Sequence, residues 1–379
     1  MQFSFEISCI NIVKIIYIIM KKIVIVFGGT SVEHDVSIIT GLQAINSLKE
    51  EYEVIPVYLS LENTFFLTDK LKPSDYFDKE KVKKSSTLVT FFDGQLMKIK
   101  KTKLQKLKDF DCVLNCCHGG VGENGELNAF FKLNNINCSS ANTFSSGVCM
   151  NKYFTKLFLR DLGVPVVDGV LINKYSFNKN IEVVAKTLKD DLIVKPNSLG
   201  SSIGVNKTTQ KDVKECVQTV LQLDDEVLVE NCVTNMYELN CACYQKDGEI
   251  IFSQIEKVDN KKEILSFDDK YISKEDKREI PAKIDKDLEE EIKNYTSLVY
   301  RQLRLSGVIR IDYIYDRKNK KLYLNEINTI PGSMAYYLFQ GLGINYSMLC
   351  EDIINQSKIE KQQRYFKSDI LSQTGLKVK

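Results

Sequence analysis

A strong charge of either sign is missing from this sequence. Its 52 lysines and arginines face 50 aspartates and glutamates, which leaves a formal net charge of +2. The longest basic cluster, residues 98–103, lacks the extent of a nucleic-acid-binding stripe. Internal repeats and low-complexity tracts are missing too. These absences argue against nucleic acid as a partner and leave a small molecule as the expectation.

A membrane-spanning stretch is also missing. The most apolar run near the start, residues 10–20, is interrupted by Lys14, is shorter than the roughly 20 residues of a spanning helix, and offers no small-residue cleavage site before Lys21. No membrane partner is therefore expected. We interpret Met20 as the initiator and residues 1–19 as an upstream extension, and an ordered N-terminal extension is the alternative.

The cysteines lack the pattern of a disulfide framework. There are eleven of them, an odd number, and most lie scattered within apolar runs such as residues 112–114 and 241–243. Reduced thiols in a cytoplasmic enzyme are therefore expected. Cys116, Cys117 and His118 adjoin one another, but this spacing cannot close a tetrahedral site, so zinc is not expected.

Two common nucleotide-binding loops are absent as well. No Gly-x-x-x-x-Gly-Lys-Ser/Thr occurs, and the glycines at residues 28–29 do not form the Gly-x-Gly-x-x-Gly dinucleotide pattern. The sequence therefore gives little support for a P-loop protein or for an NAD-binding protein of the usual kind.

What the sequence does contain is the pattern of an α/β protein, in a chain long enough for two or three domains. Apolar runs predict strands at residues 22–27, 52–59, 111–116, 191–196, 226–230, 237–244, 249–258, 307–315 and 321–327. Helical spacing predicts helices at residues 37–48, 145–162 and 284–305. We place domains at residues 20–140, 141–233 and 234–358, a mobile loop at 259–279 and a dispensable tail at 359–379.

The last two strands predict a metal site. Arg310 and Asp312 lie two residues apart, as do Glu326 and Asn328, so each pair shares one face of its strand. With the turn near Asn319, Asp312 falls opposite Glu326. Two carboxylates and an amide oxygen are hard ligands that suit Mg²⁺, which completes its shell with water and substrate phosphates. A solvated sheet face with alternating charges is the alternative.

Two glycine-rich loops follow predicted strands. Residues 197–204 carry glycines and hydroxyls whose backbone N–H groups can surround phosphate oxygens, and a flexible linker is the alternative. Residues 117–125 follow the strand at 111–116, at the end of the sheet where α/β proteins bind substrates.

Taken in order, these segments resemble the D-alanine–D-alanine ligase family of the ATP-grasp superfamily, over nearly all of residues 20–355. Residues 28–37 and 118–125 are similar to its first two signatures, and residues 194–204 resemble its phosphate loop. Residues 310–312 together with 325–332 resemble its metal and oxyanion motifs.

The resemblance implies an α/β (α+β) ATP-grasp fold of three domains. An N-terminal Rossmann-like parallel-sheet domain would bind substrate, and the nucleotide would lie between the central and C-terminal domains. The implied ATP-binding residues are Lys152, Lys195, Ser202, Glu230, Glu238 and Lys270. The implied ligands of two Mg²⁺ ions, which Mn²⁺ can replace, are Asp312, Glu326 and Asn328.

The resemblance also implies a reaction, the ligation of two D-alanines through a D-alanyl phosphate to supply D-alanyl-D-alanine for peptidoglycan synthesis. The implied catalytic residues are Glu33, Ser201, Tyr271, Arg310 and Gly332, and the implied substrate-binding residues are His118, Tyr337 and Leu338. Glu33 would hold the ammonium of the first D-alanine, and Arg310 with the Gly332 N–H would meet the tetrahedral oxyanion. A cytoplasmic homodimer is expected.

The pattern departs from the family at Tyr337, where a serine usually binds the carboxylate of the second D-alanine. The tyrosine hydroxyl could still donate a hydrogen bond, but its bulk changes the acceptor pocket. The alternatives are therefore the same chemistry with another D-amino acid or D-lactate as acceptor, a non-catalytic ATP-binding homologue, or a small-molecule kinase.

Overall fold

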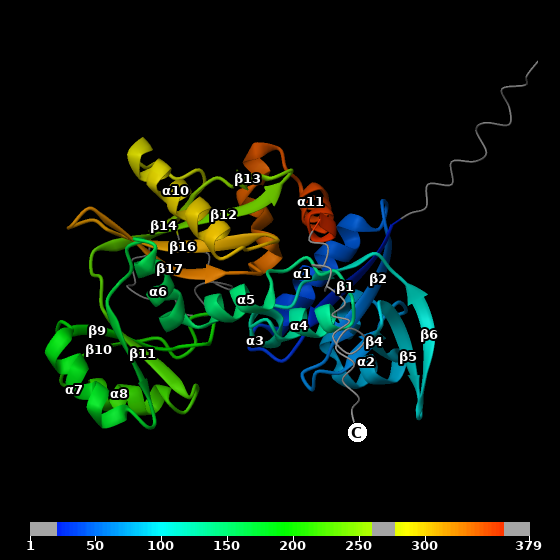
Figure 1. Ribbon diagram of the computed structural model, residues 1–379, viewed down its shortest axis with the longest axis horizontal. Helices are drawn as coiled ribbons and strands as arrows, with labels where there is room; N and C mark the ends of the chain where they lie inside the picture. The colour runs from blue at the N-terminus through cyan, green and yellow to red at the C-terminus, as the bar shows by residue number, and fades with distance from the viewer. Residues whose placement is uncertain (1–20, 260–276, 360–379) are drawn as a thin grey trace, which may run out of the picture.

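The computed structural model describes residues 21–259 and 277–359, which form three β-sheets in successive parts of the chain (Figure 1). The apolar run at residues 10–20, the predicted upstream extension, most of the loop at 259–279 and nearly all of the predicted tail lie outside the described residues. No helix within the described ranges is both long and apolar enough to cross a membrane.

Sheet A has seven strands in the order β6-β5-β4-β3-β2-β1-β7. Its strands are β1 (Lys22–Gly28), β2 (Glu53–Leu59), β3 (Phe65–Leu67), β4 (Thr87–Phe92), β5 (Gln95–Lys100), β6 (Lys103–Asp109) and β7 (Cys112–Asn115). Only β2, β1 and β7 are parallel. The expected parallel sheet is therefore confirmed for three strands and wrong for the other four, which form antiparallel hairpins.

Helices cover sheet A on both faces, and one of them comes from the far end of the sequence. They are α1 (His34–Leu48), α2 (Lys79–Ser85), α3 (Gly120–Glu123), α4 (Glu126–Leu133) and α11 (Tyr346–Ile359), with a 3₁₀ turn at Pro73–Phe77. One hydrophobic cluster joins the strand residues Ile23 and Leu114 with Leu349 and Ile353 of α11. Helix α11, the last element of the described chain, thus completes the hydrophobic core of the first sheet.

Sheet B is antiparallel, with the strand order β10-β9-β11-β8. Its elements are β8 (Gly169–Asn173), α7 (Phe177–Thr187), β9 (Asp191–Pro196), β10 (Asn206–Thr209), α8 (Val213–Val220) and β11 (Glu226–Asn231). The single helix expected at 145–162 is wrong, because α5 (Thr143–Met150) and α6 (Lys152–Asp161) are separate helices. The chain turns at Asn151, whose Oδ1 accepts a hydrogen bond from Phe154 N at 2.9 Å and caps α6.

Sheet C has the order β15-β14-β12-β16-β17, with β13 paired to β12. Its strands are β12 (Met236–Lys246), β13 (Glu249–Phe252), β14 (Glu256–Asp259), β15 (Lys277–Glu279), β16 (Ile309–Asp316) and β17 (Lys321–Asn328). Helix α10 (Lys286–Gln302) packs on it, and 3₁₀ turns follow at Gly332–Leu338 and Gln340–Leu342. The single strand expected at 249–258 is wrong, because residues 253–255 separate β13 from β14; of these, Ser253 still bonds across to Ala242.

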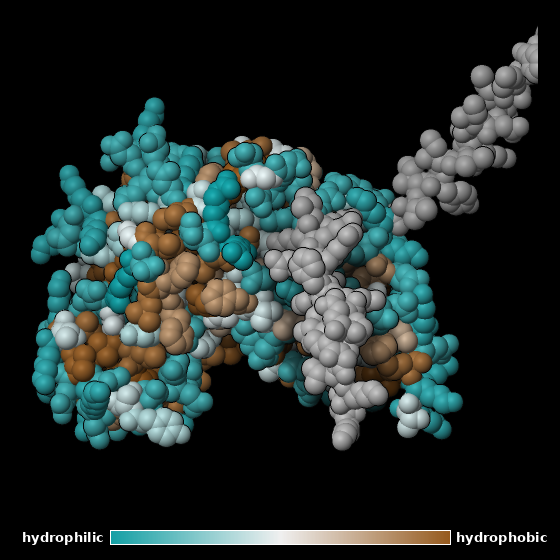
Figure 2. All heavy atoms as spheres, viewed as in Figure 1, coloured by the Kyte–Doolittle hydropathy of each residue, from teal (hydrophilic) through white to brown (hydrophobic). Residues whose placement is uncertain are grey.

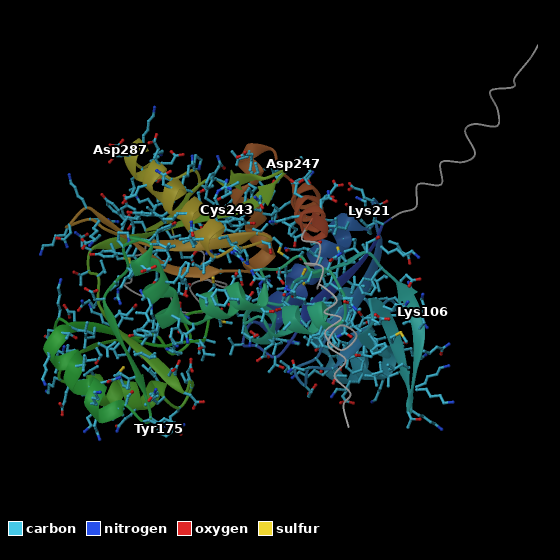
Figure 3. All side chains as sticks on the ribbon, in the orientation of Figure 1. Lys21, Lys106, Tyr175, Cys243, Asp247 and Asp287 are labelled. Carbon is cyan, nitrogen blue, oxygen red and sulfur yellow. The ribbon has the colours of Figure 1, made fainter. Side chains whose placement is uncertain are left out.

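Strand β6 forms one outer edge of the molecule, where its side chains are mostly exposed. Figure 3 labels Lys106 at this edge, and Figure 2 shows the rim as largely hydrophilic. Four of the seven residues of β6 are charged, namely Lys103, Lys106, Lys108 and Asp109. Lysines on an edge strand discourage pairing with other chains. The charged side chains of β6 therefore protect the exposed edge of sheet A.

Candidate functional site

Two cavities meet where the three sheets approach one another. The larger lies between sheets B and C and holds about 930 Å³ of empty space, and the smaller lies between sheet-A loops and sheet C and holds about 460 Å³, with part of each volume open to solvent. Four residues line both of them, namely Lys152, Leu199, Gly200 and Glu326. An elongated ligand in the larger cavity can therefore extend into the smaller one.

Three buried charges form a cluster beside the larger cavity, which two of them, Lys195 and Glu230, line. The Glu230 carboxylate is 2.6 Å from Lys156 Nζ and 2.7 Å from Lys195 Nζ, and all three side chains are at most 8% exposed. Burial alone would raise the pKa of Glu230, but the two lysines outweigh it and lower that pKa. Lys195 also donates to Asn325 Oδ1 at 3.2 Å, which ties sheet B to sheet C.

The sequence interpretation missed Lys156. Its signal was present, because Lys152 and Lys156 are four residues apart and so lie on one face of α6. Lys152 occupies the first turn of that helix, where its Nζ donates to Leu199 O at 2.6 Å. Burial lowers the pKa of Lys152, and this amine faces both cavities.

A row of four polar side chains crosses sheet C from β14 to β17. Glu256 pairs with Asn240, Asn240 with Asp312, and Asp312 with Glu326, so all four point to one face. The predicted pairing of Asp312 with Glu326 is confirmed. Asn240 and Glu256 were missed, because their strands lie far from the hairpin in sequence.

Arg310 is locked against Asp312. Its Nε and Nη2 donate to the two Asp312 carboxylate oxygens at 2.6 and 2.7 Å, and Asn328 Nδ2 reaches Asp312 Oδ2 at 3.0 Å. Burial opposes the charge of Arg310, but Asp312 overcomes this and raises its pKa. A two-point contact fixes the guanidinium plane, which leaves its remaining N–H groups free to meet a substrate oxygen.

The residues on this face fit a magnesium site by their chemistry. Asp312 and Glu326 supply adjacent carboxylates, and a half-turn of the Asn328 amide would present Oδ1 beside them. Within the described ranges no three His, Cys, Asp or Glu side chains converge as a closed metal site. An ion held here would therefore depend on water and ligand phosphates for its other positions, as Mg²⁺ usually does.

Glu33 reaches the smaller cavity from the start of α1. Ser201 Oγ donates to its carboxylate, which joins the sheet-A loop to the glycine-rich loop of sheet B. Gly119 must be glycine here, because its φ is +62° and a Cβ would lie 2.8 Å from Glu33 Oε2. Ser201 and Ser202 also take left-handed φ values of 53° and 55°, which turn the loop at the junction of the cavities.

His118 is buried and fully hydrogen-bonded. Its Nδ1 is 2.5 Å from Ile330 O and must donate, so its Nε2 accepts from Thr40 Oγ1 at 2.7 Å. Thr40 Oγ1 in turn accepts from Ser333 N at 3.0 Å. Burial lowers the pKa of His118, which favours the neutral ring that this network needs. His118 thus holds the chain on either side of Gly332.

Glu123 was also missed. Its carboxylate lines the smaller cavity and accepts from Gly119 N and Ile330 N, both at 2.7 Å, and from Thr329 Oγ1 at 3.3 Å. Burial, together with the charge of Glu33, raises the pKa of Glu123 to about 7. Its place in the glycine-rich segment 117–125 was the available signal.

The 3₁₀ segment Gly332–Leu338 closes one side of the site. Residues 333–335 all take left-handed φ values near +50°, which makes a tight turn. Tyr337 is half-buried and its hydroxyl donates to Glu256 Oε2 at 3.0 Å. The Leu338 side chain is fully buried in the cluster with α11, and its carbonyl accepts from Gln254 N at 3.0 Å.

The site residues predicted from the sequence thus fall into four groups. Lining the larger cavity are Lys152, Lys195, Ser202, Glu230, Glu238, Asp312 and Glu326, and lining the smaller are Glu33, Lys152, Glu326 and Asn328. Six predicted residues line neither cavity: the buried His118 and Leu338, and also Ser201, Arg310, Gly332 and Tyr337. Lys270 and Tyr271 lie outside the described residues.

The chain matches two family models in succession. The model described as "D-ala D-ala ligase N-terminus" matches residues 22–141, and "D-ala D-ala ligase C-terminus" matches residues 158–355. A D-alanine–D-alanine ligase of Thermosipho melanesiensis is 36% identical over 344 residues, covering 89% of this chain and 93% of that protein. One from Helicobacter pylori is 31% identical over 344 residues, covering 90% and 96%.

Solved structures show the same fold. The crystal structure of D-alanine–D-alanine ligase from Helicobacter pylori superimposes with a TM-score of 0.71 at 29% identity, covering 88% of this chain and 99% of that one. The VanG D-Ala:D-Ser ligase from Enterococcus faecalis gives a TM-score of 0.77 at 24% identity, covering 89% and 99%, and supports the fold alone.

These matches define the class of protein as an ATP-dependent ligase. Because both family models and relatives above 30% identity span most of the chain, it belongs to the D-alanine–D-alanine ligase family, whose members ligate D-alanine for peptidoglycan.

Proposed function

We propose that this protein ligates two D-alanines in an ATP- and Mg²⁺-dependent reaction through a D-alanyl phosphate. The observation that carries the proposal is the junction of the two cavities at Lys152, Leu199, Gly200 and Glu326. ATP in the larger cavity, between the central and C-terminal parts of an ATP-grasp fold, would direct its terminal phosphate into the smaller one. Glu33 would there hold the ammonium of the first D-alanine.

The cationic side chains around the junction suit an attack of one anion on another. A D-alanine carboxylate approaching the γ-phosphate meets charge repulsion, which Lys152 and Lys195 would reduce. Because Glu230 also has Lys156 as a partner, Lys195 can turn toward phosphate without leaving that carboxylate unpaired. Ser202 and the glycines of its loop would supply backbone N–H groups to the phosphates.

Asp312, Glu326 and Asn328 would hold the Mg²⁺ ions. Bound there, the ions would neutralise charge on the phosphate oxygens. Lys270 and Tyr271, in the loop expected to close over the nucleotide, would keep water from the acyl phosphate.

The second half of the reaction would use Arg310 and the backbone N–H of Gly332. The amine of the second D-alanine attacks the acyl phosphate, and negative charge develops on the carbonyl oxygen. Asp312 orients Arg310, and the His118 and Glu123 hydrogen bonds hold the chain beside Gly332. One well-placed donor of this kind is typically worth about 3 to 4 kcal/mol in the transition state. Phosphate then leaves.

Tyr337 favours a second candidate, the same chemistry with a different acceptor. It occupies the expected acceptor site with a side chain much larger than serine, and its hydroxyl is already bonded to Glu256. Another D-amino acid would then be the acceptor. We also propose a cytoplasmic homodimer as the working form.

The test is a reaction of the protein with ATP, Mg²⁺ and D-alanine, followed by phosphate release and product mass. We expect ADP, phosphate and D-alanyl-D-alanine in equal amounts, and loss of all three with excess chelator. A panel of D-serine, D-lactate and glycine decides between the two candidates. A phosphorylated product that needs no amine would indicate a kinase, and ATP binding without ADP release would indicate a non-catalytic homologue.

The Arg310→Lys variant separates binding from chemistry. Lysine keeps the charge but cannot make the two-point contact with Asp312. We expect kcat to fall at least about 100-fold with little change in the KM for ATP. The exposed Arg301→Lys on α10 is the matched control and should retain full activity.

A further inference from the structure

Glu256 is a buried carboxylate close to the candidate acceptor site, and the reaction proposed above gives it no part. It is 1% exposed, whereas burial of an ionised group is unfavourable unless other groups compensate for it. Its closest cation among the described residues is Arg278, whose Nη1 is 3.8 Å from Oε1. Glu256 Oε1 makes no hydrogen bond to the described part of the chain.

The other oxygen of Glu256 fixes the direction of two hydrogen bonds. Oε2 accepts from Asn240 Nδ2 at 2.9 Å and from the Tyr337 hydroxyl at 3.0 Å. A carboxylate can only accept, so the phenol must donate, and it has a single proton to give. The Tyr337 oxygen therefore presents only lone pairs to anything else that approaches it.

Tyr337 lies where the family resemblance puts the acceptor, although it lines neither of the two cavities. It lies five residues after Gly332 and is half-buried. It is also close enough to Arg310 for the guanidinium charge to act on the phenol. Burial and the nearby Glu256 raise the pKa of Tyr337 to about 12, although Arg310 opposes this. The phenol thus keeps its proton, and that proton stays on the Glu256 side.

We propose that Glu256, acting through Tyr337, is a specificity-determining residue that makes the acceptor subsite accept hydrogen-bond donors and reject anions at the phenol. The acceptor it favours presents an amine there, and a hydroxy acid, which lacks the cationic ammonium, is disfavoured. This reverses the expectation that Tyr337 donates to the acceptor carboxylate. The inference rests on the proposed ligase reaction and names the residue that selects its second substrate.

The Glu256→Gln variant tests it, because it keeps the shape but removes the charge and can direct an N–H at the phenol. With D-alanine and D-lactate present together, we expect the ratio of dipeptide to D-alanyl-D-lactate to fall about tenfold. The half-saturation constant for the second D-alanine should rise by a similar factor. Those for ATP and the first D-alanine should stay within about twofold.

Two further variants keep the test decisive. Tyr337→Phe removes the same hydrogen bond from the other side, so it should shift the product ratio in the same direction and add little to Glu256→Gln in the double variant. The exposed Glu249→Gln on β13 is the matched control and should change nothing. If Glu256→Gln fails to fold, Tyr337→Phe decides.

An active Glu256→Gln protein with an unchanged product ratio overturns the inference and leaves the ligase assignment intact. An unchanged ratio in folded Tyr337→Phe does the same. A wild-type protein that joins D-alanine to no acceptor overturns the proposed function itself, so the two failures can be told apart.

Discussion

Glu123 carries a half-buried carboxyl group whose protonation should be visible in the stability of the whole protein. Burial and Glu33 raise its pKa from 4.5 to about 7 in the folded state. A raised pKa means that the unfolded chain releases the proton more readily. The stabilisation is therefore complete below about pH 4.5 and is lost as the pH rises through about 7.

The corresponding prediction compares wild type with Glu123→Gln by urea denaturation between pH 4.5 and 8. The difference in free energy of unfolding should change by about 3 kcal/mol across this range, with wild type losing stability relative to the variant as pH rises. The exposed Glu126→Gln should show a difference that does not depend on pH. A flat difference for Glu123→Gln as well would contradict the raised pKa.

Individual site residues could be predicted where their chemistry lies within a short segment. Asp312 and Glu326 do face each other in the hairpin, but a register shift between Asp312 and Tyr313 brings them together, because counting from the turn alone would pair Asp312 with Asn325. Asn240 and Glu256 belong to the same row, but strand order alone brings them there, and local spacing does not encode strand order. Lys156 was missed for another reason, because a lysine on a helix is usually exposed.

At the level of elements, the break between α5 and α6 places Lys152. The Asn151 side chain caps α6, and Lys152 follows it in the first turn, where it contacts Leu199 O. We expect Asn151→Ala to cost about 1 kcal/mol of unfolding free energy and to raise the KM for ATP several-fold.

Asn142→Ala is the matched control, since Asn142 caps α5 in the same way through Ser145 N. It should cost a similar amount of stability without changing the KM for ATP. Equal effects of the two variants on ATP would show that the position of the cap has no bearing on the nucleotide.

The bounds of elements with strong hydrophobic periodicity were predicted closely. Elements whose bounds depend on turn or cap residues were not. Strand β9 has the expected bounds of residues 191–196. The hairpin of β4 and β5 was overlooked, although Asp93 and Gly94 both take positive φ in the two-residue turn that an Asp-Gly pair favours. The helix at 145–162 looked continuous because a cap residue within an apolar pattern is easily taken for a helical position.

On the scale of the whole molecule, the larger cavity is built from two sheets, between which Lys195 donates to Asn325. A ligand that contacts both sheets should therefore stabilise their arrangement. We expect a non-hydrolysable ATP analogue at about 100 times its Kd to add about 2.7 kcal/mol to the free energy of unfolding.

Removal of Mg²⁺ should reduce that gain, because Asp312 and Glu326 would then face the phosphates without a cation between them. AMP, which lacks the outer phosphates, should show little dependence on Mg²⁺. Thermal denaturation with each ligand, with and without chelator, measures both effects. A gain that is the same with and without Mg²⁺ would argue against the metal site.

The three-part organisation was within reach of the sequence, since each sheet is formed by one continuous stretch of chain. The packing of α11 onto sheet A could not be predicted from the sequence. Helix α11 packs against β7 and α1 although more than 200 residues separate it from either, and an apolar helix pattern does not say which sheet it covers.

The packing of α11 onto sheet A also has a consequence for folding during synthesis. A ribosome releases sheet A well before α11, which covers part of its apolar face and lies more than 200 residues later in the chain. Until then the nascent chain exposes residues such as Ile23 and Leu114 to the cell. Premature termination anywhere before Tyr346 would leave that surface bare, so incomplete chains should be natural clients of chaperones and proteases rather than partly active enzymes.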